Sequence, residues 1–310
     1  MEKGIYITAN DKVADQAIAL LNSIRAYDAD IPVVLIPYND DYHSVASRLG
    51  QDFGVTVFED LDLIERLSSN LHSIFGKGFF ARANQFRKQV CWFGPFEKFL
   101  YIDTDIVVFS QIAKVLDYLN TYDFVCYDYQ HTGGITNVFT PEVFTSGVFA
   151  EADRHSLFNC GFWASKRRLF SEADLYDVFR ECANHPEYFD FSQKTSDQPI
   201  INYMILKHVT RRFNVVHREG KAPGSWAGSR HFEQRGHRLI DPKIDQPLDY
   251  LHWAGIRIQP GCPYWEIWAY YRYLNNSDPR PVPGPPPAPP SPWQQLSTSL
   301  KRSIKNLLNA

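Results

Sequence analysis

Short apolar runs alternate with helical patterns over the first 60 residues, and no other feature restricts the fold of the chain as much. Residues 5–8 form a β-rich run, and apolar side chains then recur at helical spacing between 14 and 24. Residues 32–36 are almost continuously apolar, as strands buried on both faces of a parallel sheet are. A third run at 55–58 follows a second helical pattern. This alternation predicts an α/β domain with helices on both faces of its sheet.

The polar residues after the first predicted strand lie where such a sheet would bind a ligand. Ligands of open α/β sheets bind at the carboxyl ends of the strands, which here are marked by Thr8, Ala9, Asn10 and Asp11. Asn10 and Asp11 are also good helix N-cap residues, so a purely structural role fits them equally well.

Composition limits the classes of partner and compartment. The 310 residues, 44% of them hydrophobic, suffice for one large domain or two small ones, and the net charge of −3 argues against nucleic-acid binding. The five cysteines are scattered and form no CxxC pair, which favours a reducing compartment over a zinc knuckle or a disulfide framework. We find neither a leader pattern nor the roughly 20 apolar residues that span a bilayer. A cytoplasmic location is therefore expected.

Two acids interrupt one long apolar run in the middle of the chain. Asp103 and Asp105, separated by Thr104, lie between the runs 98–102 and 106–109. Two carboxylates at i and i+2 after a strand can reach one Mg²⁺ or Mn²⁺ ion, which completes its shell with water and phosphate oxygens. The alternative is a strand that simply ends in solvent. The apolar residues beyond the pair argue against a casual surface turn, but these residues alone leave both interpretations open.

The later chain continues the mixed pattern. A basic helix is expected at 80–92, a polar loop region at 128–156 and an irregular basic stretch at 218–247. Further helices are expected at 171–183, 197–208 and 264–274, a strand at 213–216, and further apolar segments at 158–163 and 250–255.

The C-terminal tail differs from the body, which we place at 1–276. Nine of the fourteen residues from 279 to 292 are proline, so 277–292 is predicted to be an extended linker. Residues 293–310 place Trp and Leu on one helical face and Lys and Arg on the other. Such a helix can lie on a membrane surface, which would make the protein peripheral on its inner face, or pack against the body or a second subunit.

Five segments, in order, resemble glycosyltransferase family eight, which contains glycogenin and bacterial lipooligosaccharide galactosyltransferases. Residues 100–108 are similar to its DxD segment, 7–11 to its first nucleotide-binding turn and 158–161 to its FNxG segment. Residues 197–198 are similar to its DQ pair and 252–255 to its HxxG segment. The resemblance spans about residues 4–274 and implies a GT-A, Rossmann-like domain with a mixed, mostly parallel sheet.

The resemblance also implies a reaction and its residues. It implies metal-dependent transfer of a hexose from a nucleotide-sugar, most simply a UDP-sugar with Mn²⁺ or Mg²⁺, to a glycan, lipid or protein acceptor, with retained anomeric configuration. The metal ligands would be Asp103, Asp105 and His252. Donor contacts would come from Thr8, Ala9, Asn10, Arg82, Thr104, Gly255 and Arg257, and the sugar would meet Asn159, Asp197 and Gln198.

The chain departs from the family at two places. Asn10 stands where many members carry an aspartate that contacts uracil, which bears on the choice of base. The family's lysine-proline-tryptophan after HxxG is missing, and Arg257 lies one position out of register with that lysine. These departures concern the base and diphosphate contacts more than the fold.

Other interpretations are consistent with the same residues. His252 alone is more often a packed histidine, Asp197 and Gln198 can simply begin a helix, and Asn159 can mark a bulge. Asp103 and Asp105 also fit the DxDx[TV] motif of haloacid-dehalogenase-like phosphatases, although the acidic loop of that family is missing here. A third possibility is a non-catalytic GT-A binding module.

Overall fold

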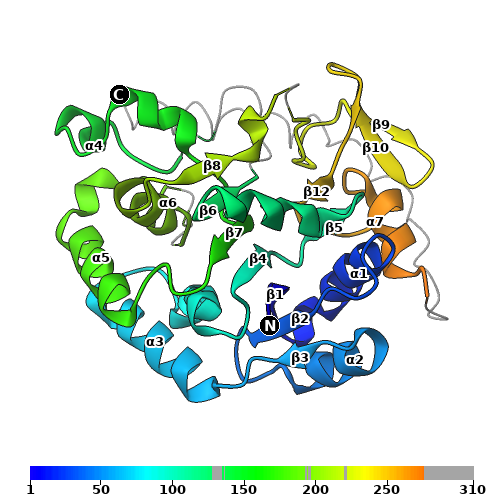
Figure 1. Cartoon of the computed structure of the whole chain (residues 1–310), viewed down its shortest axis with the longest axis horizontal. Helices are drawn as coiled ribbons and strands as arrows, with labels where there is room; N and C mark the ends of the chain where they lie inside the picture. Colours follow the sequence, from blue (N-terminus) through cyan, green and yellow to red (C-terminus); the bar gives the residue numbers. More distant parts are fainter. Residues whose placement is uncertain (128–134, 136, 193, 195–196, 220–221, 276–310) are drawn as a thin grey trace, which may run out of the picture.

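The structure is a computed structural model that describes residues 1–127, 135, 137–192, 194, 197–219 and 222–275 (Figure 1). Part of the predicted loop region 128–156 lies outside the described residues. The predicted linker 277–292 and helix 293–310 lie wholly outside them.

A seven-stranded sheet forms the centre of the molecule, with the order β3-β2-β1-β4-β7-β6-β8. Only β7 runs antiparallel to its neighbours β4 and β6, while the remaining pairs are parallel. The predicted α/β fold with a mixed, mostly parallel sheet is therefore confirmed. The strands are β1 (Lys3–Ala9), β2 (Val33–Pro37), β3 (Thr56–Val57), β4 (Lys98–Ile102), β6 (Phe124–Cys126), β7 (Phe162–Lys166) and β8 (Arg212–Asn214).

Side chains of the central strands alternate between two cores, because successive residues of a strand point to opposite faces. Tyr6 and Tyr101 pack with one helical layer, and Ile5 and Ile102 pack with the other. The first layer comprises α3 (Leu61–Ile74), the 3₁₀ segment η2 (Ala83–Phe93), α5 (Glu172–Asn184) and α6 (Asp197–His208). The second comprises α1 (Ala14–Arg25), α2 (His43–Phe53) and the 3₁₀ segment η3 (Ile112–Asn120).

A third core lies beside α1, where α7 (Trp265–Arg272) covers a pair of short strands. These strands, β5 (Ile106–Val108) and β12 (Tyr250–His252), run antiparallel. The stretch 218–247, which the sequence predicts to be irregular, instead contains a three-stranded antiparallel sheet whose central strand buries Leu239 in this core. Its strands are β9 (Glu233–Arg235), β10 (Arg238–Asp241) and β11 (Gln246–Pro247).

Two further segments differ from the sequence expectation. The helix predicted at 80–92 is the 3₁₀ segment η2, which begins at Ala83. The strand predicted at 213–216 ends at Asn214, because the Asn214 side chain accepts a hydrogen bond from the Val216 N–H and caps a short 3₁₀ turn. Short helical segments α4 (Glu142–Thr145), η1 (Asp11–Val13), η4 (Glu151–Ser156), η5 (Pro186–Tyr188) and η6 (Val215–His217) complete the described elements.

Across the described residues, every helix is too short or too polar to cross a bilayer.

Candidate active site

The acid pair lies in the turn between β4 and β5, and neighbouring backbone fixes the turn at both acids. The Asp103 N–H donates to the Gly161 carbonyl at 2.8 Å, and the Trp253 N–H donates to the Asp105 carbonyl at 3.0 Å. Antiparallel pairing of β5 with β12 places His252 opposite Ile106. As a result, the His252 Nε2 atom lies 3.0 Å from Asp105 Oδ1, although the two residues are far apart in sequence.

Asp103, Asp105 and His252 present ligand atoms that all lie within 4.8 Å of one another. Two carboxylates and one imidazole are a suitable donor set for Mn²⁺, and also for Mg²⁺ where oxygen donors from substrate complete the shell. The space around them depends on Gly161. A Cβ atom there would lie 2.4 Å from His252 Cε1 and 2.7 Å from Asp103 Oδ2. The three residues and the glycine beside them therefore fit a divalent cation.

We expect Gly161→Ala to weaken Mn²⁺ binding by at least about tenfold, because the added methyl must displace His252 or Asp103 from the cluster. Isothermal titration with Mn²⁺ measures the change. Gly78→Ala is the matched control, since a Cβ at Gly78 meets no atom within 4 Å. Equal Mn²⁺ affinity in the two variants would contradict a metal site at this position.

The three side chains of this cluster have perturbed protonation. Burial raises the pKa of Asp103 above its ordinary range, and the nearby Asp105 carboxylate adds to this while Lys88 opposes it. Burial acts in the same direction on Asp105, but the adjacent His252 outweighs it and holds the pKa of Asp105 below its ordinary value. For His252, burial acts to lower the pKa, and the Asp105 carboxylate more than reverses this.

Mn²⁺ affinity should therefore fall as the pH falls. The raised pKa of His252 means that the imidazole binds a proton at mildly acidic pH, and the raised pKa of Asp103 means that this carboxylate takes up a proton at higher pH than an ordinary aspartate does. A cation must displace those protons. Titrations between about pH 5.5 and about pH 8 measure this, and the heat of binding in buffers of different ionisation enthalpy counts the protons released. Affinity that stays constant across this range would contradict the assignment of these ligands.

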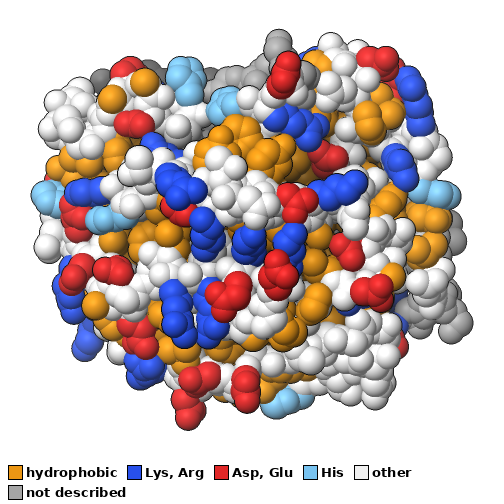
Figure 2. Space-filling view, viewed as in Figure 1, with side chains coloured by type: hydrophobic (Ala, Val, Ile, Leu, Met, Phe, Trp, Pro, Cys, Tyr) orange, Lys and Arg blue, Asp and Glu red, His pale blue; other side chains and the backbone are white. Residues whose placement is uncertain are grey.

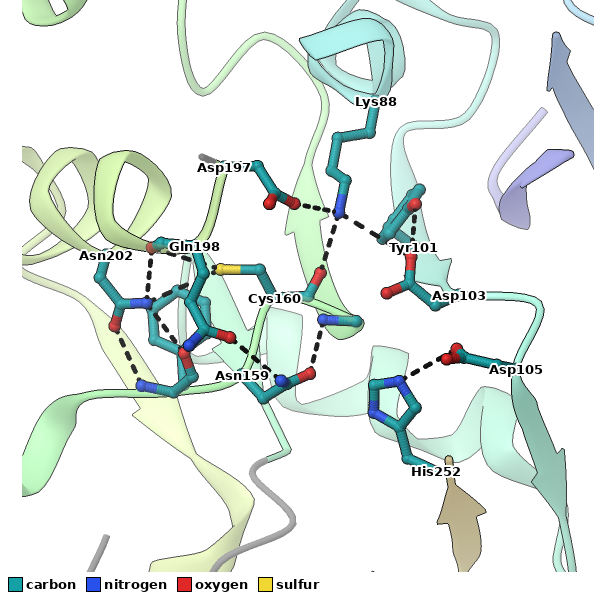
Figure 3. Close-up of polar contacts among 12 residues, drawn as sticks. Lys88, Tyr101, Asp103, Asp105, Asn159, Cys160, Asp197, Gln198, Asn202 and His252 are labelled. Carbon is teal, nitrogen blue, oxygen red and sulfur yellow. Dashed lines mark hydrogen bonds and ion pairs between the residues drawn. The ribbon is translucent and has the colours of Figure 1, made fainter. Parts of the chain in front are cut away.

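Lys88 is a buried cation that joins the acid pair to the start of α6. Its Nζ atom lies 2.6 Å from Asp197 Oδ2 and 3.8 Å from Asp103 Oδ1, and 4.7 Å from the centre of the Tyr101 ring (Figure 3). Burial acts to lower the pKa of Lys88, but the two carboxylates raise it well above its ordinary value, so the side chain stays charged. The Tyr101 hydroxyl donates to Asp103 Oδ1 at 2.7 Å and helps to fix that carboxylate.

A second polar chain joins Asn159 to α6. The Asn159 amide donates to Gln198 Oε1 at 3.0 Å, and Asn159 Oδ1 accepts from the Gly161 N–H at 2.9 Å. Behind them, the buried Asn202 accepts from the Phe158 N–H and donates to the Gln198 carbonyl (Figure 3). These hydrogen bonds fix the position of the segment that leads into β7 relative to the first turn of α6.

A cavity of about 390 Å³ adjoins these groups. One wall comes from the end of β1 and the turn that follows, where Asn10 Oδ1 accepts from the Lys12 N–H. The rest of the lining includes charged side chains of the Lys88 network. The lining residues are Thr8, Ala9, Asn10, Lys12, Val13, Tyr38, Asn84, Gln85, Lys88, Tyr101, Asp103 and Asp197.

A larger hollow of about 900 Å³ lies between α1 and α2. Its lining includes none of the residues that the sequence predicts for the site, and it contacts neither the acid pair nor Lys88. The smaller cavity is therefore the better candidate for a ligand of this site.

The structure brings together most, but not all, of the residues that the sequence predicts. Thr8, Ala9, Asn10, Asp103 and Asp197 line the cavity, Asp105 and His252 complete the cluster, and Asn159 and Gln198 hydrogen-bond to each other.

Four predicted donor-binding residues do not line the cavity. Arg82 is exposed at the start of η2, and Arg257 is exposed after β12. The Thr104 hydroxyl lies 3.5 Å from Gln16 Oε1 of α1. Gly255 is exposed and has a positive φ of 71°, which favours glycine at this turn.

Lys88 and Tyr101 are among the site residues that the sequence does not single out. Lys88 lies in the stretch predicted as a basic helix, four positions before Trp92. A lysine on the same helical face as a tryptophan is a weak signal of burial. Its partners Asp103 and Asp197 come from other elements, so the ion pairs require the fold.

Comparison with known proteins gives matches in structure only. No family model and no curated protein matches the sequence. The bifunctional glycosyltransferase WbbM, in its apo structure, is 14% identical with a TM-score of 0.58 over 89% of this chain, which spans 50% of that protein. The galactosyltransferase LgtC, in complex with donor and acceptor sugar analogues, is 13% identical with a TM-score of 0.56, covering 89% of this chain and 97% of LgtC.

An active-site mutant of LgtC matches over 86% of this chain with a TM-score of 0.51. At these identities the likeness concerns the backbone arrangement, and it agrees with the mixed seven-stranded sheet described above. The chain therefore has the GT-A fold found in these glycosyltransferases.

Proposed function

We propose that this chain is a metal-dependent glycosyltransferase that transfers a hexose from a UDP-sugar. The observation that carries the proposal is the position of the Asp103, Asp105 and His252 cluster beside a cavity at the carboxyl end of the sheet. The cavity is lined by a polar turn and by a buried lysine and a carboxylate. In a nucleotide-sugar, the polar turn would contact the nucleotide, the metal cluster would contact the diphosphate, and the lysine and carboxylate would contact the sugar.

The cluster would hold Mn²⁺ or Mg²⁺ through both carboxylates and His252 Nε2. When bound, such a cation neutralises the charge that develops on the departing diphosphate. Tyr101 keeps the Asp103 carboxylate oriented through its hydroxyl, and the loop backbone fixes both acids. The chain thus presents preorganised ligands rather than assembling them during the reaction.

Lys88 and Asp197 would bind the donor sugar. The Lys88 ammonium has one close partner, Asp197 at 2.6 Å, and two more distant ones, the Cys160 carbonyl at 3.5 Å and Asp103 at 3.8 Å. A sugar hydroxyl can accept from the ammonium and donate to the Asp197 carboxylate. Such hydrogen bonds to charged groups orient the sugar with little loss of freedom, because both groups are already fixed.

Asn159 and Gln198 would contact the sugar at its reacting face. Their mutual hydrogen bond fixes the orientation of the Gln198 amide, and Asn202 fixes the backbone beneath it. One of the LgtC structures carries a glutamine-to-glutamate change in its active site, which supports the proposal that Gln198 belongs to the active site of this chain. We propose retention of anomeric configuration and assign no nucleophile. Product analysis by NMR decides this point, since an inverted product would contradict retention.

Uracil is the proposed base, bound near Thr8, Ala9 and Asn10, and the acceptor is a glycan, lipid or protein. Five free cysteines, four of them buried, support a reducing compartment such as the cytoplasm. Contact of residues 293–310 with a membrane surface stays a prediction from the sequence. Liposome flotation with and without these residues tests it, and equal flotation would remove it.

The direct test of the proposed function is incubation with a set of UDP-hexoses and Mn²⁺, followed by measurement of UDP. We expect release that depends on Mn²⁺ and on one or a few of the donors. UDP that never appears would contradict the proposal and favour a non-catalytic module. Phosphate released from a phosphomonoester would instead favour the phosphatase alternative, although the third side chain at the acid pair is a histidine rather than an acidic loop.

A further inference from the structure

Three phenylalanines meet at the surface, on segments that lead in sequence to residues of the proposed active site. The ring centres of Phe79 and Phe80 lie 4.8 Å apart, and that of Phe191 lies 5.4 Å from Phe80 and 5.6 Å from Phe79. Phe80 is 41% exposed, and in the described part of the chain only Met1 and Leu61 are large hydrophobic residues that are equally open. We refer to Phe79, Phe80 and Phe191 as the aromatic platform.

The platform packs against core residues, and these contacts fix the backbone position of Phe80. Phe79 stacks on Phe75 at 4.3 Å with an angle of 18° between the rings, and also faces Phe86 of η2. His72 of α3 hydrogen-bonds to the carbonyl of Ala81, one residue after Phe80. Phe79 thus anchors the segment to the core, and its neighbour Phe80 presents a ring to solvent.

Both segments of the platform lead directly into the walls of the 390 Å³ cavity. Phe80 precedes the lining residue Asn84 by four positions, which limits their separation to about 14 Å even for a fully extended chain. Phe191 precedes the lining residue Asp197 by six positions, a limit of about 21 Å. Because the rings of Phe80 and Phe191 also contact each other, both limits apply to one cluster, and the Cα atom of Phe80 lies within about 14 Å of that of the lining residue Asn84.

We propose that the aromatic platform binds the sugar ring of a glycan acceptor, with an apolar C–H face of the pyranose lying on Phe80. The proposal rests on the proposed transferase function, since it places the acceptor beside the donor. A pyranose combines a flat apolar face with a polar edge of hydroxyl groups. The platform matches this, because its exposed ring at Phe80 lies between two exposed basic residues in sequence, Lys77 and Arg82. A lipid tail would need a larger, continuous apolar groove.

The test is saturation-transfer NMR with lactose and with maltose as probes, in the presence of UDP and Mg²⁺. We expect transfer from protein to the C–H protons of one face of a sugar ring. Phe80→Ala should weaken binding of that disaccharide about tenfold, since stacking on an aromatic ring contributes that much to comparable flat ligands. Phe80→Trp should restore it. Leu61→Ala is the control, because Leu61 has similar exposure at the far end of α3 and should leave binding unchanged.

Any one of three outcomes would contradict a sugar-binding role for the platform. The first is that neither disaccharide binds the wild-type protein, and the second is that Phe80→Ala binds as tightly as wild type. The third is that Phe80→Trp fails to restore binding although it melts at the wild-type temperature. The donor site is measured separately by titrating UDP and Mg²⁺ into the wild-type protein. If the wild-type protein does not bind UDP, the proposed function is contradicted. If it binds UDP but neither disaccharide, only the sugar-binding role of the platform is contradicted.

Discussion

Asp105→Asn should lower Mn²⁺-dependent UDP release by roughly a thousandfold, because a bound cation is worth several kcal/mol to a departing diphosphate. The substitution keeps the shape of the side chain and removes its charge. It also removes the charged partner of His252, whose Nε2 lies 3.0 Å from Asp105 Oδ1. Steady-state UDP release at several Mn²⁺ concentrations measures the loss, and excess Mn²⁺ should restore only part of it.

Asp177→Asn is the matched control for this result, since Asp177 is an exposed acid on α5 that pairs with Arg180. Its activity and melting temperature should equal those of wild type. If Asp105→Asn retained metal-dependent activity within a few-fold of Asp177→Asn, the cluster would not be the metal site. If it lost activity only because it unfolded, its melting temperature would fall, and Asp103→Asn would then provide the second comparison.

Most strands of the central sheet could be predicted from the sequence because they are apolar runs, but β6 is only three residues long and is not predicted, and β7 (Phe162–Lys166) overlaps the expected apolar segment 158–163 only at its start. Residues 32–36 and 99–102 are apolar on both faces, and this follows from burial between two helical layers. The small sheet at β9 to β11 carries no such signal. All three residues of β9, Glu233–Arg235, are exposed, so no apolar alternation marks the strand.

The metal cluster was predictable only through the family resemblance. Spacing alone relates Asp103 to Asp105, but His252 reaches them through the pairing of β12 with β5, which is a tertiary contact. Lys88 shows the same limit more strongly. The sequence around Lys88 gives no reason for a buried cation on η2. Its ion pairs form only because the turn after β4 and the start of α6 bring Asp103 and Asp197 to the same point.

Lys88→Met should destabilise the protein by about 3 kcal/mol near neutral pH, because it removes a buried cation and leaves two partly buried carboxylates without that partner. The cost should shrink as the pH falls. Burial already raises the pKa of Asp103, and loss of Lys88 raises it further, so the folded variant binds a proton more readily than the unfolded chain. Urea unfolding from about pH 5 to about pH 8 measures this slope. Lys207→Met is the control, because the Lys207–Glu181 pair is partly exposed and should contribute no more than about 1 kcal/mol.

The double variant Lys88→Met with Asp197→Asn separates stability from function. Removing the Asp197 charge leaves one carboxylate instead of two facing the methionine, so most of the lost stability should return, and Mn²⁺ at the cluster should offset the charge of Asp103. UDP release should not return, because the ammonium and carboxylate proposed to orient the sugar are both gone. A double variant that regained stability and activity together would show that Lys88 only neutralises buried charge. A double variant as unstable as Lys88→Met would place the cost of losing Lys88 at Asp103 and the Tyr101 ring rather than at Asp197.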